Sequence, residues 1–337
     1  MNAPGSGSPV PITKLRVAIL YGGRSGEHEI SIRSARAVME HMDPDKYEQA
    51  SYFIDKDGKW SPRPILPEPG AQPDIDVVFP VLHGTFGEDG TIQGLLELAD
   101  LPYVGAGVMA SAISMDKEVM KRVCAERMLP IVDYVVVTRE KPDLDGIARR
   151  LPFPIFVKPA NLGSSVGISK VRSCQELEAA VLMAAEYDTK IIVERGIVGR
   201  ELECAVLGNE APVASLPCEI LPSREFYDYE DKYLLDKAET KVPADLPGDK
   251  TEELRRLAVE CYRAMDCEGM ARVDFLLEAA TGQLFINEIN TIPGFTSISM
   301  YPKMWEHSGI PMRALIDQLI QLALQRHRRR KATRFTR

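Results

Sequence analysis

Residues 270–277, MARVDFLL, and residues 283–294, QLFINEINTIPG, form the stretch that decides the fold of this chain. Each run is rich in branched and aromatic side chains, and the segment ATGQ between them is typical of a turn, so the pair predicts a hairpin of two strands. Successive side chains of a strand point to opposite faces. Arg272 and Asp274 are therefore expected on one face of the first strand.

On the returning strand, Glu288 and Asn290 share a face, which leaves Phe285, Asn287 and Ile289 on the opposite one. The hairpin can thus bring two carboxylates, an amide oxygen and a guanidinium together. A few hard oxygen ligands leave room for phosphate oxygens and water, as Mg²⁺ requires. A surface ladder of ion pairs is the alternative. The glycine-containing loop that follows the second strand favours a site, because it offers backbone donors to a substrate.

A glycine-rich loop also follows a predicted strand at residues 157–167, VKPANLGSSVG. Lys158 lies at the end of that strand, and the backbone N–H groups of the loop could cradle phosphates while the ammonium group meets their charge. The segment is not a GxxxxGK[ST] P-loop, since the lysine precedes the glycines. A glycine loop by itself is more often a turn, but its combination with the carboxylate hairpin favours phosphate binding.

The first hundred residues alternate strands with helices. Residues 15–21, LRVAILY, lead into the loop and helix start 22–31, GGRSGEHEIS, where Ser31 is the expected N-cap; residues 76–84, DVVFPVLHG, repeat the design. GGRSG lacks the GxGxxG spacing, so a dinucleotide site is only weakly indicated. The alternation predicts an α/β fold with a parallel sheet and helices on both faces, followed by α+β segments.

Composition limits the functional classes. The chain has 337 residues and a formal net charge of −8, although residues 326–337, RHRRRKATRFTR, hold seven Lys or Arg. The remaining chain is therefore more acidic still and should repel nucleic acid. The basic end itself is expected to be solvated, disordered and dispensable for activity. Neither a membrane-spanning segment nor a secretory leader is apparent, so a soluble cytoplasmic protein is expected.

Taken together, the motifs resemble those of the ATP-grasp enzymes and, among these, of the D-alanine:D-alanine ligase family. The resemblance covers roughly residues 15–325. The segments that carry it, in order, are GGRSGEHEIS (22–31), LHGTFGEDGTIQG (82–94), VGAGVMASAISMDK (104–117), VKPANLGSSVG (157–167), FYDYEDKY (226–233), ARVDF (271–275) and NEINTIPGFTS (287–297).

The resemblance implies an ATP-grasp fold preceded by a Rossmann-like (preATP-grasp) domain. The expected divisions are a disordered leader at 1–14, an N-terminal α/β domain at 15–116, a central ATP-grasp subdomain at 117–200, a C-terminal ATP-grasp subdomain at 201–325 with a lid loop at 224–247, and the basic tail at 326–337. The lid is polar and too long for a tight turn, which is typical of functional loops.

The implied reaction is the ATP-driven joining of two D-alanines to D-alanyl-D-alanine, through a D-alanyl phosphate, for peptidoglycan synthesis. The implied cofactors are ATP and two Mg²⁺ ions, with Mn²⁺ able to replace them, and the implied assembly is a homodimer. No nucleic acid or membrane partner is expected. Two alternatives remain open: a D-alanine:D-lactate or other D-amino-acid ligase of the same fold, and a catalytically inactive nucleotide-binding protein.

The resemblance also assigns site residues. The catalytic set is Glu27, Ser164, Tyr233, Arg272 and Gly294; the ATP contacts are Lys117, Lys158, Ser165, Glu194, Arg195, Ile197, Glu201 and Lys232; the metal ligands are Asp274, Glu288 and Asn290; the substrate contacts are His83 and Ser299. Arg272 and the Gly294 N–H would stabilise the tetrahedral oxyanion. Glu27 would bind the first ammonium group and form a triad with Ser164 and Tyr233. His83 either lies near the first substrate or simply caps a strand end.

Overall fold

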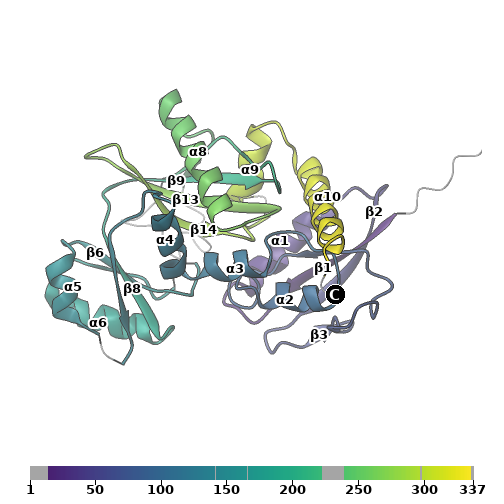
Figure 1. Cartoon of the computed structure of the whole chain (residues 1–337), viewed down its shortest axis with the longest axis horizontal. Helices are drawn as coiled ribbons and strands as arrows, with labels where there is room; N and C mark the ends of the chain where they lie inside the picture. The colour runs from purple at the N-terminus through teal and green to yellow at the C-terminus, as the bar shows by residue number, and fades with distance from the viewer. Residues whose placement is uncertain (1–13, 141, 165, 222–238, 297, 335–337) are drawn as a thin grey trace, which may run out of the picture.

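The computed structural model describes residues 14–334 except residues 141, 165, 222–238 and 297, and three β-sheets organise this part of the chain (Figure 1). The first sheet has the order β3-β2-β1-β4 and is built from β1 (Leu15–Gly22), β2 (Tyr47–Ile54), β3 (Trp60–Ser61) and β4 (Val77–Pro80). β1 pairs in parallel with both β2 and β4. Its helices are α1 (His28–His41) and α2 (Thr91–Leu98), whereas α3 (Val108–Met115) packs Ala110 into the core of the third sheet. The α/β expectation for this region is confirmed.

The second sheet is antiparallel and lies at one end of the molecule, at the lower left of Figure 1. Its order is β5-β8-β6-β7, with β5 (Tyr134–Thr138), β6 (Ile155–Pro159), β7 (Ser169–Val171) and β8 (Lys190–Arg195). The helices α5 (Leu144–Arg150) and α6 (Cys174–Ala185) share a buried apolar core with this sheet. The helix α4 (Lys117–Glu126) precedes it but packs Met120 and Cys124 into the core of the third sheet.

The third sheet is also antiparallel and has the order β12-β11-β9-β13-β14, with β10 paired to β9. Its strands are β9 (Gly199–Leu207), β10 (Val213–Ala214), β11 (Cys218–Leu221), β12 (Glu239–Lys241), β13 (Met270–Glu278) and β14 (Leu284–Asn290). The helix α8 (Gly248–Ala264) packs on it, and α9 (Met300–His307) and α10 (Met312–Lys331) complete the chain.

The hairpin of β13 and β14 contains an irregularity that sequence alternation does not predict. Arg272 pairs with Asn290 and Asp274 with Glu288, but the register then shifts so that Phe275 pairs with Ile286. The shift leaves Asn287 as a surplus residue in β14. The expectation that Asn287 faces away from the cluster is wrong, since its Oδ1 lies 3.4 Å from Nζ of Lys158.

The expectation that Ser31 caps α1 is also wrong. The helix begins at His28, three residues earlier, and its N-cap residue makes no side-chain capping bond. The Ser31 hydroxyl is buried instead: it accepts a hydrogen bond from the Gly22 N–H at 2.8 Å and donates one to the Val81 carbonyl at 2.5 Å. It therefore ties the end of β1 to the segment that follows β4, where the glycine loops of the site begin.

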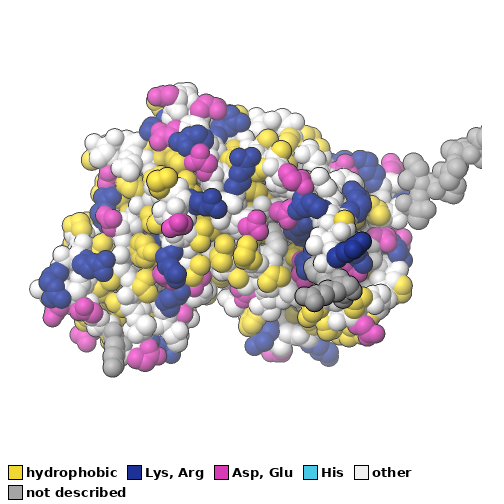
Figure 2. All heavy atoms as spheres, viewed as in Figure 1, with side chains coloured by type: hydrophobic (Ala, Val, Ile, Leu, Met, Phe, Trp, Pro, Cys, Tyr) yellow, Lys and Arg dark blue, Asp and Glu magenta, His cyan; other side chains and the backbone are white. Residues whose placement is uncertain are grey.

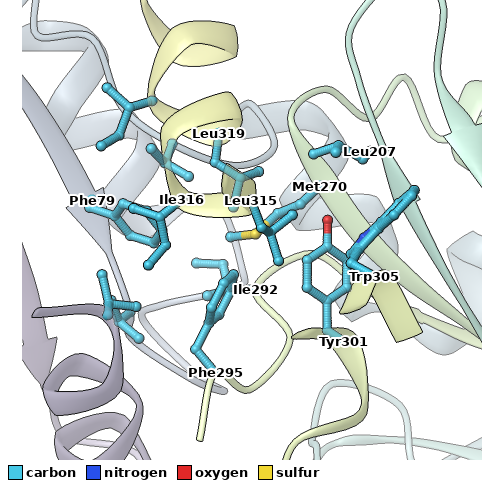
Figure 3. Packing of buried hydrophobic residues seen from close by; sticks show 14 of the residues in the cluster. Phe79, Leu207, Met270, Ile292, Phe295, Tyr301, Trp305, Leu315, Ile316 and Leu319 are labelled. Atoms are coloured by element: carbon cyan, nitrogen blue, oxygen red, sulfur yellow. The ribbon is translucent and has the colours of Figure 1, made fainter. Parts of the chain in front are cut away.

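The first and third sheets share one hydrophobic core (Figure 3). Phe79 of β4 meets Leu207 and Met270 of the third sheet there, together with Trp305 of α9 and Leu319 of α10. Burial of each such side chain contributes about 1.5 to 3 kcal/mol. The N-terminal domain therefore packs against the third sheet through apolar contacts, in addition to its covalent connection to the rest of the chain.

The basic end of the chain contradicts the expectation of a disordered tail. Helix α10 continues to Lys331, and Arg326 is 9% exposed, with its guanidinium donating to the Gly105 carbonyl and, at 2.8 Å, to the Tyr103 carbonyl. The same guanidinium stacks 4.2 Å from the centre of the Tyr103 ring. Other basic residues of this helix end form ion pairs with acidic residues: Arg329 with Glu210 and Glu268, Arg330 with Glu97, and Lys331 with Asp100. Acidic residues distant in sequence thus order residues 326–331.

Figure 2 shows Lys and Arg side chains interspersed with Asp and Glu on the displayed face, without one dominant basic surface. Among the described residues, no helix combines the length and the apolar character needed to cross a bilayer.

Replacing Arg326 with Met tests the role of the α10 end. The change leaves two backbone carbonyls buried without their donor, so we expect the free energy of unfolding to fall by about 2 to 4 kcal/mol in chemical denaturation. Arg328, exposed on the same helical turn, is the matched control, and Arg328→Met should stay within about 0.5 kcal/mol of the wild type. Equal stability of the two variants would contradict this account.

Candidate active site

A cavity of about 470 Å³ lies between the second and third sheets. The predicted nucleotide and metal residues that line it are Lys117, Lys158, Glu194, Arg195, Ile197, Glu201 and Glu288, and Ser164 of the predicted catalytic set lines it as well. They come from α4, β6, β8, β9, β14 and the connecting loops, so the fold gathers segments that are up to 171 positions apart, from Lys117 to Glu288, around one space. Ser165, Lys232 and Tyr233 lie outside the described residues.

Lys158, near the end of β6, and Glu194, in β8, form a buried ion pair at the floor of this cavity. Lys158 Nζ lies 2.6 Å from Glu194 Oε2, and the side chains are 11% and 3% exposed. Lys121 of α4 approaches the other oxygen, with Nζ 3.0 Å from Oε1. Burial alone would raise the pKa of Glu194, but the two lysines lower it to about 2. Glu194 is therefore ionised with both carboxylate oxygens engaged.

Lys117 lies at the first position of α4, where the side chain of Asp116 caps the helix by accepting from the Glu118 and Val119 N–H groups. Its ammonium donates to the Leu162 carbonyl at 2.8 Å and lies 3.5 Å from Glu288 Oε2. The lysine is thus held between the glycine loop of the second sheet and the carboxylate of β14. Two ammonium groups, from Lys117 and Lys158, face the same cavity and can meet phosphate charge.

The carboxylates of the hairpin lie on one face, as the alternation predicts. Arg272 donates two hydrogen bonds of 2.7 Å to Asp274, and its Nε lies 3.3 Å from Glu203 Oε1. Asn290 Nδ2 donates to the same Asp274 carboxylate at 3.1 Å. Burial would lower the pKa of Arg272, but Asp274 and Glu203 raise it well above its ordinary value, so the guanidinium stays charged.

The N-terminal domain meets the second sheet through Glu27 and Ser164. The Ser164 hydroxyl donates to Glu27 Oε1, and Ser164 has a φ of 54°, a left-handed conformation that is uncommon outside glycine. Gly84 borders the same carboxylate: a Cβ at this position would lie 2.5 Å from Glu27 Oε2. The predicted partnership of Glu27 and Ser164 is present, while Tyr233 of the expected triad is outside the described residues.

His83 is buried and uses both ring nitrogens internally. Its Nδ1 donates to the Ile292 carbonyl at 2.9 Å, because a carbonyl can only accept, and its Nε2 therefore accepts from the Ser34 hydroxyl at 3.0 Å. The Phe295 N–H donates in turn to Ser34 Oγ at 3.2 Å. Burial lowers the pKa of the His83 ring, which keeps it neutral. This chain of hydrogen bonds holds the loop that carries Gly294.

Gly294 and Ser299 lie together at the start of α9. A Cβ on Gly294 would lie 2.7 Å from Ser299 Oγ, so a larger residue would displace the hydroxyl. Ser299 Oγ accepts from the Thr296 N–H at 3.0 Å and lies 2.8 Å from Thr296 Oγ1. The two predicted residues are thus adjacent, one offering a backbone donor and the other a hydroxyl.

Four residues of the site escaped the sequence analysis: Glu88, Lys121, Glu203 and Asn287. Lys121 follows Lys117 by one helical turn and Glu203 follows Glu201 by one strand repeat, so spacing alone could have indicated both. The placement of Asn287 at the cavity could not be predicted without the β-bulge in β14. Glu88 lies in a loop, where no periodicity applies.

Glu88 joins the N-terminal domain to the loop after β14. Its Oε2 accepts from the Gly84 N–H at 2.9 Å and its Oε1 from the Ile292 N–H at 3.0 Å. Burial, followed by the charge of Glu27, raises the pKa of Glu88 to about 8. The Glu88 carboxyl is therefore protonated at neutral pH.

This raised pKa makes stability depend on pH. The folded state keeps the Glu88 proton up to about pH 8, whereas an unperturbed carboxyl releases it near 4.5, so the unfolded state binds fewer protons between these values. The group's contribution to stability is complete below the unfolded pKa and is lost as the pH rises, by up to about 1.4 kcal/mol per pH unit. Denaturation of Glu88→Gln at pH 5, 6, 7 and 8 should lack this slope.

Glu186→Gln, at an exposed position after α6, is the control for the Glu88 experiment and should keep the wild-type slope. Since only slopes are compared, a constant loss of stability in Glu88→Gln does not affect the conclusion. Parallel curves for Glu88→Gln and the wild type would contradict the protonated state.

Comparison with known proteins agrees with this geometry. A model of the D-ala D-ala ligase C-terminus matches residues 123–321, and a model of the D-ala D-ala ligase N-terminus matches residues 16–70 and 66–106. A D-alanine–D-alanine ligase of Solibacter usitatus is 76% identical over 324 residues, covering 96% of this chain and 100% of the relative. One from a Thermoanaerobacter species (strain X514) is 50% identical, covering 93% and 98%.

Two solved structures extend the likeness to the fold. The D-alanine-D-alanine ligase of Coxiella burnetii superposes with a TM-score of 0.85 at 41% identity, covering 94% of this chain and 96% of its own. The VanG D-Ala:D-Ser ligase of Enterococcus faecalis superposes with a TM-score of 0.84 at 35% identity, covering 92% and 100%. With its ATP-grasp fold, the chain belongs to the D-alanine–D-alanine ligase family.

Proposed function

We propose that the chain uses ATP to join two D-alanines, giving D-alanyl-D-alanine, ADP and phosphate for peptidoglycan precursors. The observation that carries the proposal is the convergence of Lys117, Lys158 and Glu288 on one cavity, next to the Glu27–Ser164 contact. The arrangement offers phosphate-binding cations and a carboxylate for an ammonium group within one site.

A free carboxylate resists attack by an amine, so the first D-alanine must be activated. Transfer of the γ-phosphoryl group to its carboxylate gives D-alanyl phosphate and ADP. This step needs neutralisation of phosphate charge and no protein nucleophile. Lys117 and Lys158, which both line the cavity, would supply that charge. We assign Lys232 and Ser165, outside the described residues, to phosphate contacts by family membership only, and Arg195, Ile197 and Glu201 to the adenosine end of the cavity.

The hairpin residues fit a magnesium site in their chemistry. Asp274 and Glu288 pair directly across β13 and β14, and Asn290 lies one strand repeat further along the same face. This face therefore carries two carboxylates and an amide oxygen, which are ligand types that Mg²⁺ prefers. No cluster of three His, Cys, Asp or Glu residues suited to a metal occurs within the described ranges, so phosphate oxygens and water would complete the coordination. Bound Mg²⁺, or Mn²⁺ in its place, would neutralise phosphate charge.

In the second step the amine of the second D-alanine attacks the acyl phosphate carbonyl, and phosphate leaves after the tetrahedral oxyanion collapses. Arg272 and the Gly294 N–H are our candidates for the donors to this oxyanion. Arg272 is preorganised by Asp274 and Glu203, which hold the guanidinium in place. Glu27 would bind the first ammonium group, with Tyr233 completing its contacts, and Ser299 would receive the second carboxylate. His83 would act by holding the Gly294 loop.

A D-alanine:D-serine or D-alanine:D-lactate ligase is the second candidate, since the VanG D-Ala:D-Ser ligase shares the fold at 35% identity. An inactive nucleotide-binding protein is less favoured because Arg272, Asp274, Glu288 and Asn290 are all in place. We also propose a cytoplasmic location, where ATP is available, and a homodimeric assembly.

Measurement of ADP release with D-alanine as first substrate tests the second substrate. We expect D-alanine to support turnover at least about tenfold better, in kcat/KM, than D-serine or D-lactate at neutral pH, with D-alanyl-D-alanine as the product identified by mass. Preferential formation of the ester or of D-alanyl-D-serine would overturn the dipeptide assignment.

Two substitutions test the catalytic assignments. Arg272→Met removes an oxyanion donor and should lower kcat by about 10² to 10³, and Glu288→Gln should raise the Mg²⁺ concentration needed for half-maximal rate. Arg256→Met, at a surface ion pair with Glu260 on α8, should leave both values unchanged. A Glu288→Gln enzyme with wild-type kinetics would remove that residue from the metal site.

A further inference from the structure

Lys121 is a buried cation that the proposed reaction does not use. Its side chain is 0% exposed, and it lies on α4 one helical turn after Lys117, on the side of the helix that faces β8. Burial of an ammonium group is costly unless an opposite charge compensates it. The compensating group is Glu194, whose Oε1 lies 3.0 Å from Lys121 Nζ.

Glu194 has a second cation on its other oxygen. Lys158 lies 2.6 Å from Oε2 and, unlike Lys121, lines the nucleotide cavity. The carboxylate is therefore a bridge between one lysine inside the protein and one lysine at the cavity wall. Counted together, Lys121, Glu194 and Lys158 carry a net charge of +1, which is the charge that Lys158 would carry alone.

The net charge of this group falls if Lys121 is replaced by a neutral residue. Lys158 and Glu194 then form a closed pair of net charge zero, and a phosphate approaching Lys158 also meets an uncompensated carboxylate 2.6 Å behind the ammonium group. The interior is where such a difference matters, because Coulomb energies there are less screened than in water. Burial would lower the pKa of Lys158, but Glu194 raises it, which shows how closely the two charges are linked.

We propose that Lys121 is a positioning residue that neutralises Glu194, so that Lys158 presents a full positive charge to the phosphates of ATP. The inference rests on the proposed nucleotide site and deepens it. The carboxylate of Glu194 orients Lys158, but its negative charge would also weaken the attraction between Lys158 and phosphate. The positive charge of Lys121 offsets that negative charge. A purely structural role for Lys121 would fix α4 against β8 without regard to charge.

The experiment measures the affinity of ADP and of adenosine by titration calorimetry on the full chain. For Lys121→Met we expect ADP to bind about 10- to 30-fold more weakly, from the loss of one charge near the phosphates at an effective dielectric constant of about 20. Adenosine, which lacks phosphates, should bind as it does to the wild type. An equal loss for both ligands, or no loss for ADP, would overturn the proposal.

The double variant Lys121→Met/Glu194→Gln separates charge from packing. It restores the net charge of +1 while removing the charges of Lys121 and Glu194, so we expect it to bind ADP at least about threefold more tightly than Lys121→Met does. A packing role predicts no recovery, because the double variant is further from the native interior, and that result would overturn the proposal. If Lys121→Met does not fold, Lys121→Gln, which retains an N–H donor without charge, carries the same expectations.

Lys158→Met provides the control for the site itself. It should weaken ADP binding at least as much as Lys121→Met, since it removes the cation that faces the phosphates. Wild-type ADP affinity in Lys158→Met would count against the nucleotide site in the proposed function. Failure of the Lys121 inference alone would leave Lys158→Met impaired, so the two failures are distinguishable.

Discussion

The position of Glu27 relative to the loop that carries Gly294 depends on one apolar contact, the core shared by the first and third sheets. Ile292 shows why, since its side chain is buried in that core while its backbone N–H donates to Glu88 and its carbonyl accepts from His83. Both partners belong to the N-terminal domain. The apolar packing therefore fixes the distance between a domain that carries Glu27 and a loop that carries Gly294, and the polar contacts fix their orientation.

At the cavity between the second and third sheets, ion pairs and not apolar contacts position the side chains. The chain is acidic overall, with a net charge of −8, yet Lys117 and Lys158 both line one cavity. Each of these two cations lies close to an acid: Lys117 to Glu288, and Lys158 to Glu194. Such acids orient the ammonium groups but also weaken their pull on phosphate. Lys121, which is buried behind Glu194 and does not line the cavity, adds a positive charge next to this acid. The net charge that phosphate meets thus depends also on a residue outside the cavity wall.

Much of the fold could be predicted because its signals are local. The hairpin of β13 and β14 follows from alternation, and the parallel pairing of β1, β2 and β4 follows from strands separated by helices. The pairing of Arg272 with Asp274 required only that the two share a strand face.

The errors came from interactions between distant segments. The end of α10 is ordered by Glu97, Asp100, Glu210 and Glu268, none of which is near it in sequence. The seven Lys and Arg of residues 326–337 therefore resembled a solvated tail. Ser31 was misplaced because its hydroxyl bonds to two strand ends and not to its own helix. The ion pair of Lys121 could not be predicted because its partner Glu194 is 73 positions away.

The surplus residue in β14 has a consequence for how this strand can vary. In a regular strand, neighbouring residues point to opposite faces, so Asn287 and Glu288 could not both serve ligands on one side. The bulge removes that restriction and lets consecutive side chains border one cavity. Loss of a single residue from this segment would restore ideal pleating and, in doing so, turn one of the two away. The irregularity of β14 is thus the geometric condition under which Asn287 and Glu288 both line the cavity.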